Sequence, residues 1–173
     1  PGGRGGATGL ALRAGAGRGV GALLPRAHVA TRALRRAQPP EAVWAVLTDV
    51  EHAPTWRPDL RTVERLPEQD GRRVWRERGR QGAITFAEDV VERPHRWVTR
   101  IADPGLPYGG RWVYELAPAD GGTRLSITEE GEVYNPLFRF VSRFVMGHHA
   151  TLEAYLRALA AHFGDSPRFE PGP

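Results

Sequence analysis

The sequence contains no cysteine and no lysine, and it has no long uninterrupted apolar run. Without cysteine, disulfide bonds, thiolate metal sites and cysteine nucleophiles are excluded, and no redox compartment can be inferred. All 24 basic residues are arginine, a pattern typical of GC-rich coding that carries no functional weight. No stretch approaches the roughly 18 apolar residues that span a bilayer, so we expect no stable membrane insertion and a soluble, cytoplasmic protein.

The net charge of +4 comes from the beginning of the chain, because residues 1–27 carry four arginines and no acidic residue. The remainder is close to neutral and lacks the clustered basic face that phosphate-backbone binding needs, so we expect no nucleic-acid partner. A module whose arginine-rich segment touches acidic membranes or nucleic acid stays open as a third hypothesis.

Composition divides the 173 residues into three parts. Residues 1–27 are mostly Gly, Ala and Arg without lasting periodicity, which predicts a disordered tail. Residues 28–164 are long enough for one domain with its own core and an internal cavity. Residues 165–173 are expected to form a second disordered tail.

The chain is organised around a predicted long helix near its end. Asn135 and Pro136 suit a helix start, and Gly164 suits a helix stop. Between them, apolar residues recur at steps of three and four and form one stripe, with His148 on it. A sheet must therefore wrap this helix.

The preceding residues supply that sheet. Residues 28–36 predict a first strand, residues 41–50 a short amphipathic helix after Pro39-Pro40, and residues 52–58 a further turn or loop. The strand-like segments that follow are 60–66, 72–78, 83–93, 96–102, 111–116 and 123–133. Turn residues at 69–71 and 120–122 and a loop over 104–110 separate them, which predicts an antiparallel meander and an α+β fold.

The order of these motifs resembles the START-like superfamily, also called SRPBCC or Bet v 1-like, and within it the polyketide cyclase/dehydrase and lipid-transport type. The motifs that carry the resemblance are residues 40–49 (PEAVWAVLTD), residues 54–58 (PTWRP), Trp112-x-Tyr114, residues 122–125 (GTRL) and the long helix. The resemblance implies a helix-grip fold: a seven-stranded antiparallel sheet around a long C-terminal helix, with two short helices after the first strand. It also implies a cavity between sheet and helix for a hydrophobic small molecule that is lipid-, polyketide- or aromatic-like.

The alternative is an enzyme of the polyketide cyclase, aromatase or dehydratase type that uses polar pocket residues. No stretch matches the catalytic sites of such members, so the sequence favours a binding domain. There is no nucleotide-binding motif, and the histidines are scattered without metal-ligand spacing. We therefore expect no metal or other cofactor, whether the protein binds or catalyses.

Ligand-binding side chains are expected from separate elements that converge under the helix. Most are aromatic and suit a flat or apolar ligand, although each could instead fill the core. The expected set is Trp44, Trp56, Arg57, Phe86, Trp97, Trp112, Tyr114, Phe144 and His148. If the pocket catalyses a reaction, the candidates for polarising a carbonyl or moving a proton are Arg57, Tyr114 and His148.

The charged candidates have alternative interpretations. Arg57 either reaches over the pocket mouth to a carboxylate or carbonyl oxygen, or forms a salt bridge with Asp59 or Glu64. Glu88 and Glu129 follow apolar residues on presumed inner faces, where a solvated position at a strand end is favoured over a general-acid role. His148 is favoured as a core or pocket-wall residue over a general base.

Overall fold

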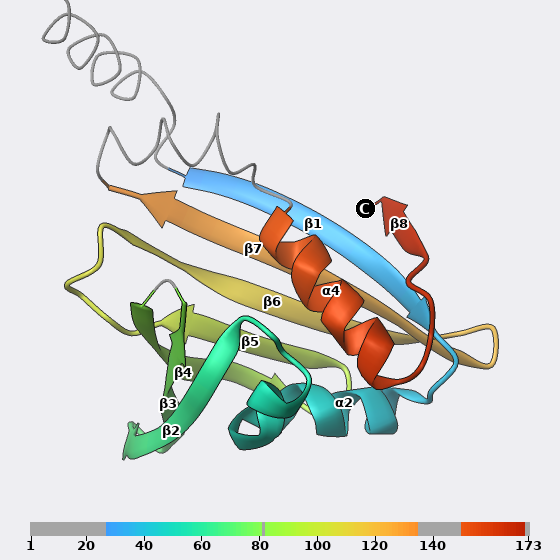
Figure 1. Cartoon of the computed structure of the whole chain (residues 1–173), viewed down its shortest axis with the longest axis horizontal. Helices are drawn as coiled ribbons and strands as arrows, with labels where there is room; N and C mark the ends of the chain where they lie inside the picture. Colours follow the sequence, from blue (N-terminus) through green and yellow to red (C-terminus); the bar gives the residue numbers. More distant parts are fainter. Residues whose placement is uncertain (1–26, 81, 135–149, 172–173) are drawn as a thin grey trace, which may run out of the picture.

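The computed structural model describes residues 27–80, 82–134 and 150–171 (Figure 1). Strands dominate this part of the chain, and two short helices follow the first strand. The elements are β1 (Ala27–Arg36), α2 (Pro40–Thr48), η1 (Val50–Thr55), β2 (Leu60–Gln69), β3 (Arg72–Gly79), β4 (Gly82–Glu92), β5 (Arg96–Ile101), β6 (Tyr108–Ala119), β7 (Gly122–Val133), α4 (Ala150–His162) and β8 (Phe169–Pro171).

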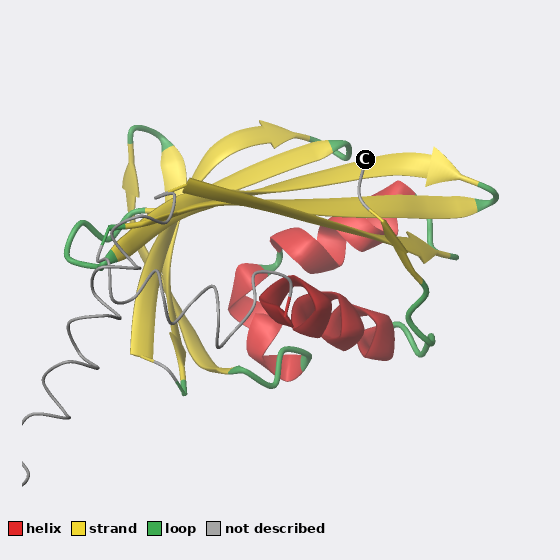
Figure 2. Ribbon diagram, turned by 90° about the horizontal axis from the view of Figure 1, so that it is seen from above, coloured by secondary structure: helices red, strands yellow, loops and turns green. Residues whose placement is uncertain are grey.

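The strands form one antiparallel sheet of eight strands in the order β2-β3-β4-β5-β6-β7-β1-β8. Figure 2 shows this sheet curving around α2, η1 and α4, which all lie on its concave side. The α+β helix-grip fold predicted from the sequence is therefore confirmed. The sheet has one strand more than the seven predicted.

The additional strand is β8, which lies within residues 165–173, where the sequence predicts a disordered tail. It pairs with β1, and its Glu170 forms ion pairs with Arg35 and with Arg124, the latter at 3.1 Å. Phe169 lies under the Arg157 guanidinium at 4.8 Å from the ring centroid. Three residues, the last of them Pro171, are too few to show strand periodicity, so only these tertiary contacts distinguish β8 from a tail.

The predicted long helix is described only in its second half, as α4. Residues 135–149, which include Phe144 and His148, lie outside the described residues. The predicted stop is confirmed: Gly164 has a φ of 75°, its N–H donates to the Ala161 carbonyl, and the Asp165 N–H donates to the Ala160 carbonyl. This pair of hydrogen bonds is a Schellman motif, which ends a helix at a residue with positive φ.

Local turn residues set the register of the meander. Asp70-Gly71 joins β2 to β3 and Asp120-Gly121 joins β6 to β7, and all four residues have positive φ. Two-residue turns of this kind match the right-handed twist of paired strands. Both turns lie where the sequence predicts them.

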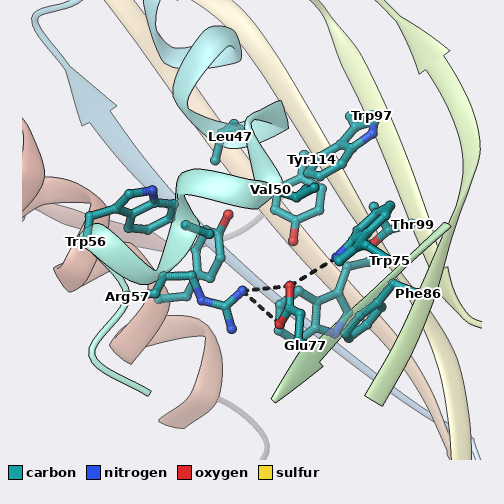
Figure 3. Close-up of a pocket in the computed structure, with 13 residues that line it drawn as sticks. Leu47, Val50, Trp56, Arg57, Trp75, Glu77, Phe86, Trp97, Thr99 and Tyr114 are labelled. Atoms are coloured by element: carbon teal, nitrogen blue, oxygen red, sulfur yellow. Dashed lines mark hydrogen bonds and ion pairs between the residues drawn. The ribbon is translucent and has the colours of Figure 1, made fainter. Parts of the chain in front are cut away.

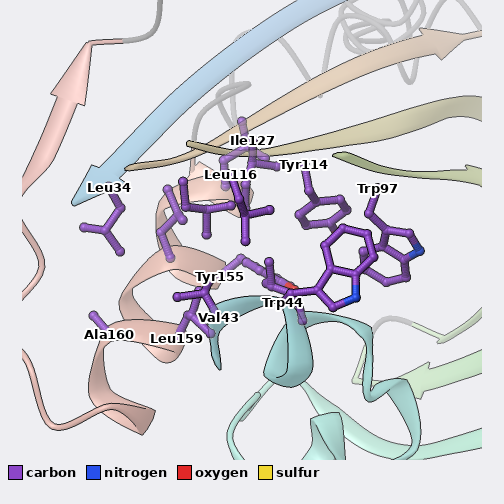
Figure 4. Packing of buried hydrophobic residues seen from close by; sticks show 14 of the residues in the cluster. Leu34, Val43, Trp44, Trp97, Tyr114, Leu116, Ile127, Tyr155, Leu159 and Ala160 are labelled. Carbon is purple, nitrogen blue, oxygen red and sulfur yellow. The ribbon is translucent and has the colours of Figure 1, made fainter. Parts of the chain in front are cut away.

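The core lies between the concave face of the sheet and the helices (Figure 4). Residues alternating along β6 and β7, such as Leu116 and Ile127, meet Leu152, Leu156 and Leu159 of α4. All five are at most 3% exposed, so this contact is dry. Burying side chains of this size contributes about 1.5–3 kcal/mol each.

The end of β1 packs closely against β7 and against the residues that follow α4. The Arg36 side chain is 1% exposed, forms an ion pair with Asp165, and lies 5.1 Å from the centroid of the Phe163 ring. A Cβ atom at Gly122 would lie 1.9 Å from the carbonyl oxygen of Arg36. Only glycine fits where the two strands approach this closely.

We predict that Gly122→Ala lowers the free energy of unfolding by about 1–3 kcal/mol, because the added methyl group forces β1 and β7 apart. The midpoint of urea denaturation would measure this. Gly105→Ala is the matched control, since its Cβ would meet only Asp103 Oδ1 at 3.8 Å. Equal midpoints for the two variants would contradict the close approach at Gly122.

Candidate functional site

A pocket lies between the concave sheet face, the segment from α2 to Arg57, and α4 (Figure 3). It is a cavity of about 20 Å³, which has room for one or two water molecules. A larger ligand therefore requires side chains of the lining to move. The lining residues are Leu47, Val50, Ala53, Trp56, Arg57, Trp75, Glu77, Phe86, Trp97, Thr99, Trp112, Tyr114 and Tyr155.

Aromatic rings from neighbouring strands form the wall on the sheet side. Trp75 stacks between Phe86 and Trp97, with ring centroids 5.9 Å apart in both pairs and interplanar angles of 23° and 14°. Trp97 lies 5.0 Å from Tyr114 on β6. These residues occupy inward-facing positions of β3, β4, β5 and β6, so strand alternation brings them together.

Tyr155 of α4 forms the opposite wall. Its ring meets Trp56 and Trp112 edge to face, with centroids 5.3 and 6.0 Å apart. The Arg57 guanidinium lies 5.1 Å from the centroid of the same ring. Aromatic pairs of this geometry contribute about 0.5–1.5 kcal/mol beyond their buried area, so Tyr155 fastens α4 to both η1 and the sheet.

A buried ion pair lies at the base of the pocket. Arg57 is 8% exposed, and its Nη1 donates to both Glu77 carboxylate oxygens at 3.1 and 3.0 Å, while Trp75 Nε1 donates to Glu77 Oε1 at 3.2 Å (Figure 3). On the side toward solvent, Arg57 Nη2 donates to Asp59 Oδ2 at 2.7 Å. Burial would lower the pKa of Arg57, but Glu77 and Asp59 raise it above its ordinary value, so the guanidinium stays charged.

Two buried phenols complete the polar groups of the pocket. Burial raises the pKa of Tyr114 well above its ordinary value, and the neighbouring Tyr155 hydroxyl raises it further. Burial also raises the pKa of Tyr155, although Arg57 opposes the shift. Both hydroxyls are therefore protonated at neutral pH and can donate to and accept from an oxygen atom of a ligand. The Tyr114 hydroxyl points into the same space as the Glu77 carboxylate (Figure 3).

The structure brings most of the sequence-predicted ligand residues into this pocket. Trp44 is an exception, since it is 5% exposed in the hydrophobic core and is not among the lining residues. Phe144 and His148 lie outside the described residues. The predicted residues found in the lining are Trp56, Arg57, Phe86, Trp97, Trp112 and Tyr114.

Of the two roles considered for Arg57, the salt bridge with Asp59 is present, and Arg57 also lines the pocket. The alternative partner Glu64 is wrong. It pairs in register with Arg76 and so points to the opposite face of the sheet from Glu77.

Sequence reasoning missed Glu77, Trp75 and Tyr155. Tyr155 belongs to the apolar stripe of the predicted helix, and Trp75 and Glu77 alternate with arginines along one strand. Because Trp75 and Glu77 are two residues apart on one strand, this alternation places the Glu77 carboxylate on the same face as Trp75, and it was the signal from which Glu77 could have been predicted.

Glu88 is not the solvated strand-end charge that the sequence predicts. It is 7% exposed and accepts hydrogen bonds from Arg73 Nη2 at 2.6 Å and Trp97 Nε1 at 2.9 Å. Burial would raise the pKa of Glu88, but these hydrogen bonds lower it below its ordinary value. Arg73 also donates to the Thr48 carbonyl at the end of α2, so this network joins α2 to the sheet. Glu129, considered with Glu88, is partly exposed on β7.

Two other findings bear on function. Within residues 27–80, 82–134 and 150–171, no three His, Asp or Glu side chains are grouped so that they could hold a metal ion. No helix of the described chain has the length and apolar character needed to cross a membrane.

Comparison with known proteins supports the fold. The family described as polyketide cyclase/dehydrase and lipid transport matches residues 28–164. A search of curated proteins finds no match.

Several solved structures share the architecture. A START superfamily protein from Mycobacterium smegmatis is 20% identical with a TM-score of 0.65, covering 78% of this chain and 96% of its own. Norcoclaurine synthase from Thalictrum flavum is 14% identical with a TM-score of 0.62, covering 77% and 91%. The Zhui aromatase/cyclase from Streptomyces sp. R1128 is 19% identical with a TM-score of 0.56, covering 81% and 99%. At these identities the likeness concerns the fold.

We predict that Glu88→Gln lowers the free energy of unfolding by about 1–3 kcal/mol at neutral pH, because Arg73 loses its charged partner. The pKa of Glu88 is lower in the folded protein than the ordinary value of 4.5, so its stabilisation is present above that pH and is lost as the pH falls through the folded pKa. The difference between the two proteins should therefore shrink in acid.

Urea denaturation at a series of pH values would measure this difference. Glu92→Gln is the control, since Glu92 is exposed on the same strand. A gap between wild type and Glu88→Gln that stayed constant down to acid pH would contradict the assignment.

Proposed function

Because this chain belongs to the polyketide cyclase/dehydrase and lipid-transport family, we propose that it binds a hydrophobic small molecule between the sheet and α4. One observation carries the proposal: seven of the described lining residues are aromatic, and two of them are buried phenols that supply neutral polar groups. Such a lining suits a lipid-, polyketide- or aromatic-like molecule, whose polar end the phenols would orient. We propose residues 28–164 as the binding domain and the cytoplasm as its location.

Room for the ligand would come from the lining itself. Trp56 and Trp112 are partly exposed, whereas Trp75, Trp97 and Tyr155 are at most 7% exposed. The first two have fewer neighbours to displace, so we propose that they move when the ligand enters.

We predict that an uncharged aromatic alcohol, 3-phenylpropan-1-ol, quenches or shifts the tryptophan fluorescence in a saturable way, since four of the five tryptophans line the pocket. Tyr155→Phe should weaken binding about fivefold, because one hydrogen bond is lost while the ring is kept. Tyr134→Phe, at a tyrosine that is 50% exposed, is the control and should bind as wild type. No saturable change with this probe, and no ligand released on denaturing extraction, would count heavily against the proposal.

The second candidate is an enzyme of the cyclase or dehydratase type. It is favoured by the Glu77 carboxylate, which lines the same pocket as the neutral phenols of Tyr114 and Tyr155 and interacts electrostatically with both. A phenol O–H could hydrogen-bond to a carbonyl oxygen while Glu77 accepts the proton from the adjacent carbon and returns it to the departing hydroxyl group, which leaves as water. The likeness to an aromatase/cyclase and to norcoclaurine synthase supports the candidate at the level of the fold.

If the protein is such an enzyme, we predict that it accelerates the dehydration of 4-hydroxy-4-phenylbutan-2-one. Tyr114→Phe should then reduce the turnover rate by about tenfold or more, because the phenol stabilises charge that develops only in the transition state. Absorbance of the enone product would follow the reaction, and fluorescence titration would follow binding. Equal losses in turnover and in binding would assign Tyr114 to binding alone.

A further inference from the structure

We infer that the pocket takes an uncharged ligand carrying a hydroxyl or carbonyl oxygen and discriminates against carboxylates. This inference rests on the proposed binding function and specifies the ligand. It runs against the simplest expectation for Arg57, namely that an arginine in an apolar pocket recognises a ligand's acid group.

The donors of Arg57 are already engaged by protein carboxylates. Nη1 donates to both oxygens of Glu77, at 3.1 and 3.0 Å. Nη2 and Nε donate to the two oxygens of Asp59, at 2.7 and 3.4 Å. Each nitrogen of the guanidinium therefore has an acceptor within the protein, and the face of the group lies against the Tyr155 ring. These four hydrogen bonds leave one of the five guanidinium N–H donors, on Nη2, without a carboxylate partner, so an incoming carboxylate would have to share the cation with Glu77 and Asp59.

The charge balance also opposes an anion. One guanidinium and two carboxylates leave this cluster with a net charge of −1. The Asp59 side chain is 61% exposed and is screened by solvent, but the Glu77 side chain is 13% exposed and faces the pocket. A second carboxylate in the same space would meet a poorly screened like charge, and burying it would also cost its hydration.

Groups suited to an uncharged oxygen remain available. The hydroxyls of Tyr114 and Tyr155 are neutral, and Thr99 adds a third hydroxyl from β5. The Tyr114 and Tyr155 hydroxyls hydrogen-bond to each other, so a ligand carbonyl would accept from the phenol O–H that this bond leaves or from Thr99, and an alcohol can also donate. The aromatic walls take the rest of the molecule. An uncharged ligand pays only a small desolvation cost when it hydrogen-bonds to these phenols, since no ion is removed from water.

The experiment compares three ligands that differ only in their polar end: 3-phenylpropan-1-ol, 3-phenylpropanoate and 3-phenylpropylamine. Tryptophan fluorescence at neutral pH would give a dissociation constant for each. We expect the alcohol to bind about tenfold or more tightly than the acid, and more tightly than the amine, because burying an ammonium group costs its hydration. An acid that bound as tightly as the alcohol would overturn the inference, as would an amine that bound best.

Glu77→Gln provides the sharper test, because it removes the competing carboxylate and keeps an oxygen for Trp75 Nε1. The guanidinium would then have a free donor toward the pocket, so the ratio of the acid's affinity to the alcohol's affinity should rise about tenfold. A purely structural role for Glu77 would weaken both ligands together, and that result would overturn the inference.

Asp59→Asn is a second variant that leaves the Arg57–Glu77 pair intact. It removes one negative charge from the solvent side, where screening is strong, so the acid should gain only about twofold to threefold. Circular dichroism would show whether Glu77→Gln folds. If it does not, Asp59→Asn and the wild-type comparison still test the inference. Equal affinities of acid and alcohol in the wild type, together with no gain in acid affinity in Asp59→Asn, would overturn it. Absence of binding by all three ligands would instead count against the proposed function.

Discussion

The ion pair between Arg57 and Glu77 joins three parts of the fold within one buried contact. Arg57 follows η1, where its backbone N–H donates to the Ala53 carbonyl at 2.8 Å, Glu77 lies on β3, and Tyr155 of α4 covers the guanidinium. Breaking a buried pair by removing one partner typically costs about 3–5 kcal/mol, because the other charge is left without compensation. The pair therefore constrains how η1, the sheet and α4 sit together, and the pocket exists in the space that this arrangement leaves.

The same arrangement occurs twice on the concave face. Glu77 accepts hydrogen bonds from Arg57 and from the indole of Trp75, and Glu88 accepts them from Arg73 and from the indole of Trp97. The first pair anchors the residue after η1 and the second anchors the end of α2 through the Thr48 carbonyl. Each carboxylate is thus compensated by one cation and one neutral donor. Two short helices with small apolar faces are held against the sheet in this way.

Local signals were enough to predict the architecture. Asp-Gly turns, the paired prolines before α2 and the glycine after α4 act through backbone geometry that the nearest neighbours determine, so they could be recognised one segment at a time. The features that were missed depend on residues far apart in the chain. Glu88 looks like a strand-end charge until Arg73 is known to reach it, and β8 looks like a tail until Glu170 meets Arg35 and Arg124.

The pocket residues also divide into those that local sequence patterns predict and those that depend on contacts between distant segments. Alternating aromatic residues indicated which strand faces point inward, and most of the predicted aromatic lining follows from that pattern. Glu77 and Tyr155 were harder to predict, since their roles arise only where β3 and α4 approach the same arginine. Sequence periodicity assigns a residue to a face, whereas partners across the sheet decide whether it lines a cavity or fills a core, as Trp44 does.

The stacked indoles of Trp75 and Trp97 also have a consequence for how the protein absorbs and emits light. Their centroids lie 5.9 Å apart with an interplanar angle of 14°, close enough for their excited states to couple and for excitation energy to pass between them. The Trp75 indole also points its N–H at a carboxylate, so the local electric field shifts its transition energy. The unmodified chain therefore carries a chromophore pair inside its own pocket, whose spectrum follows the spacing of β3 and β5.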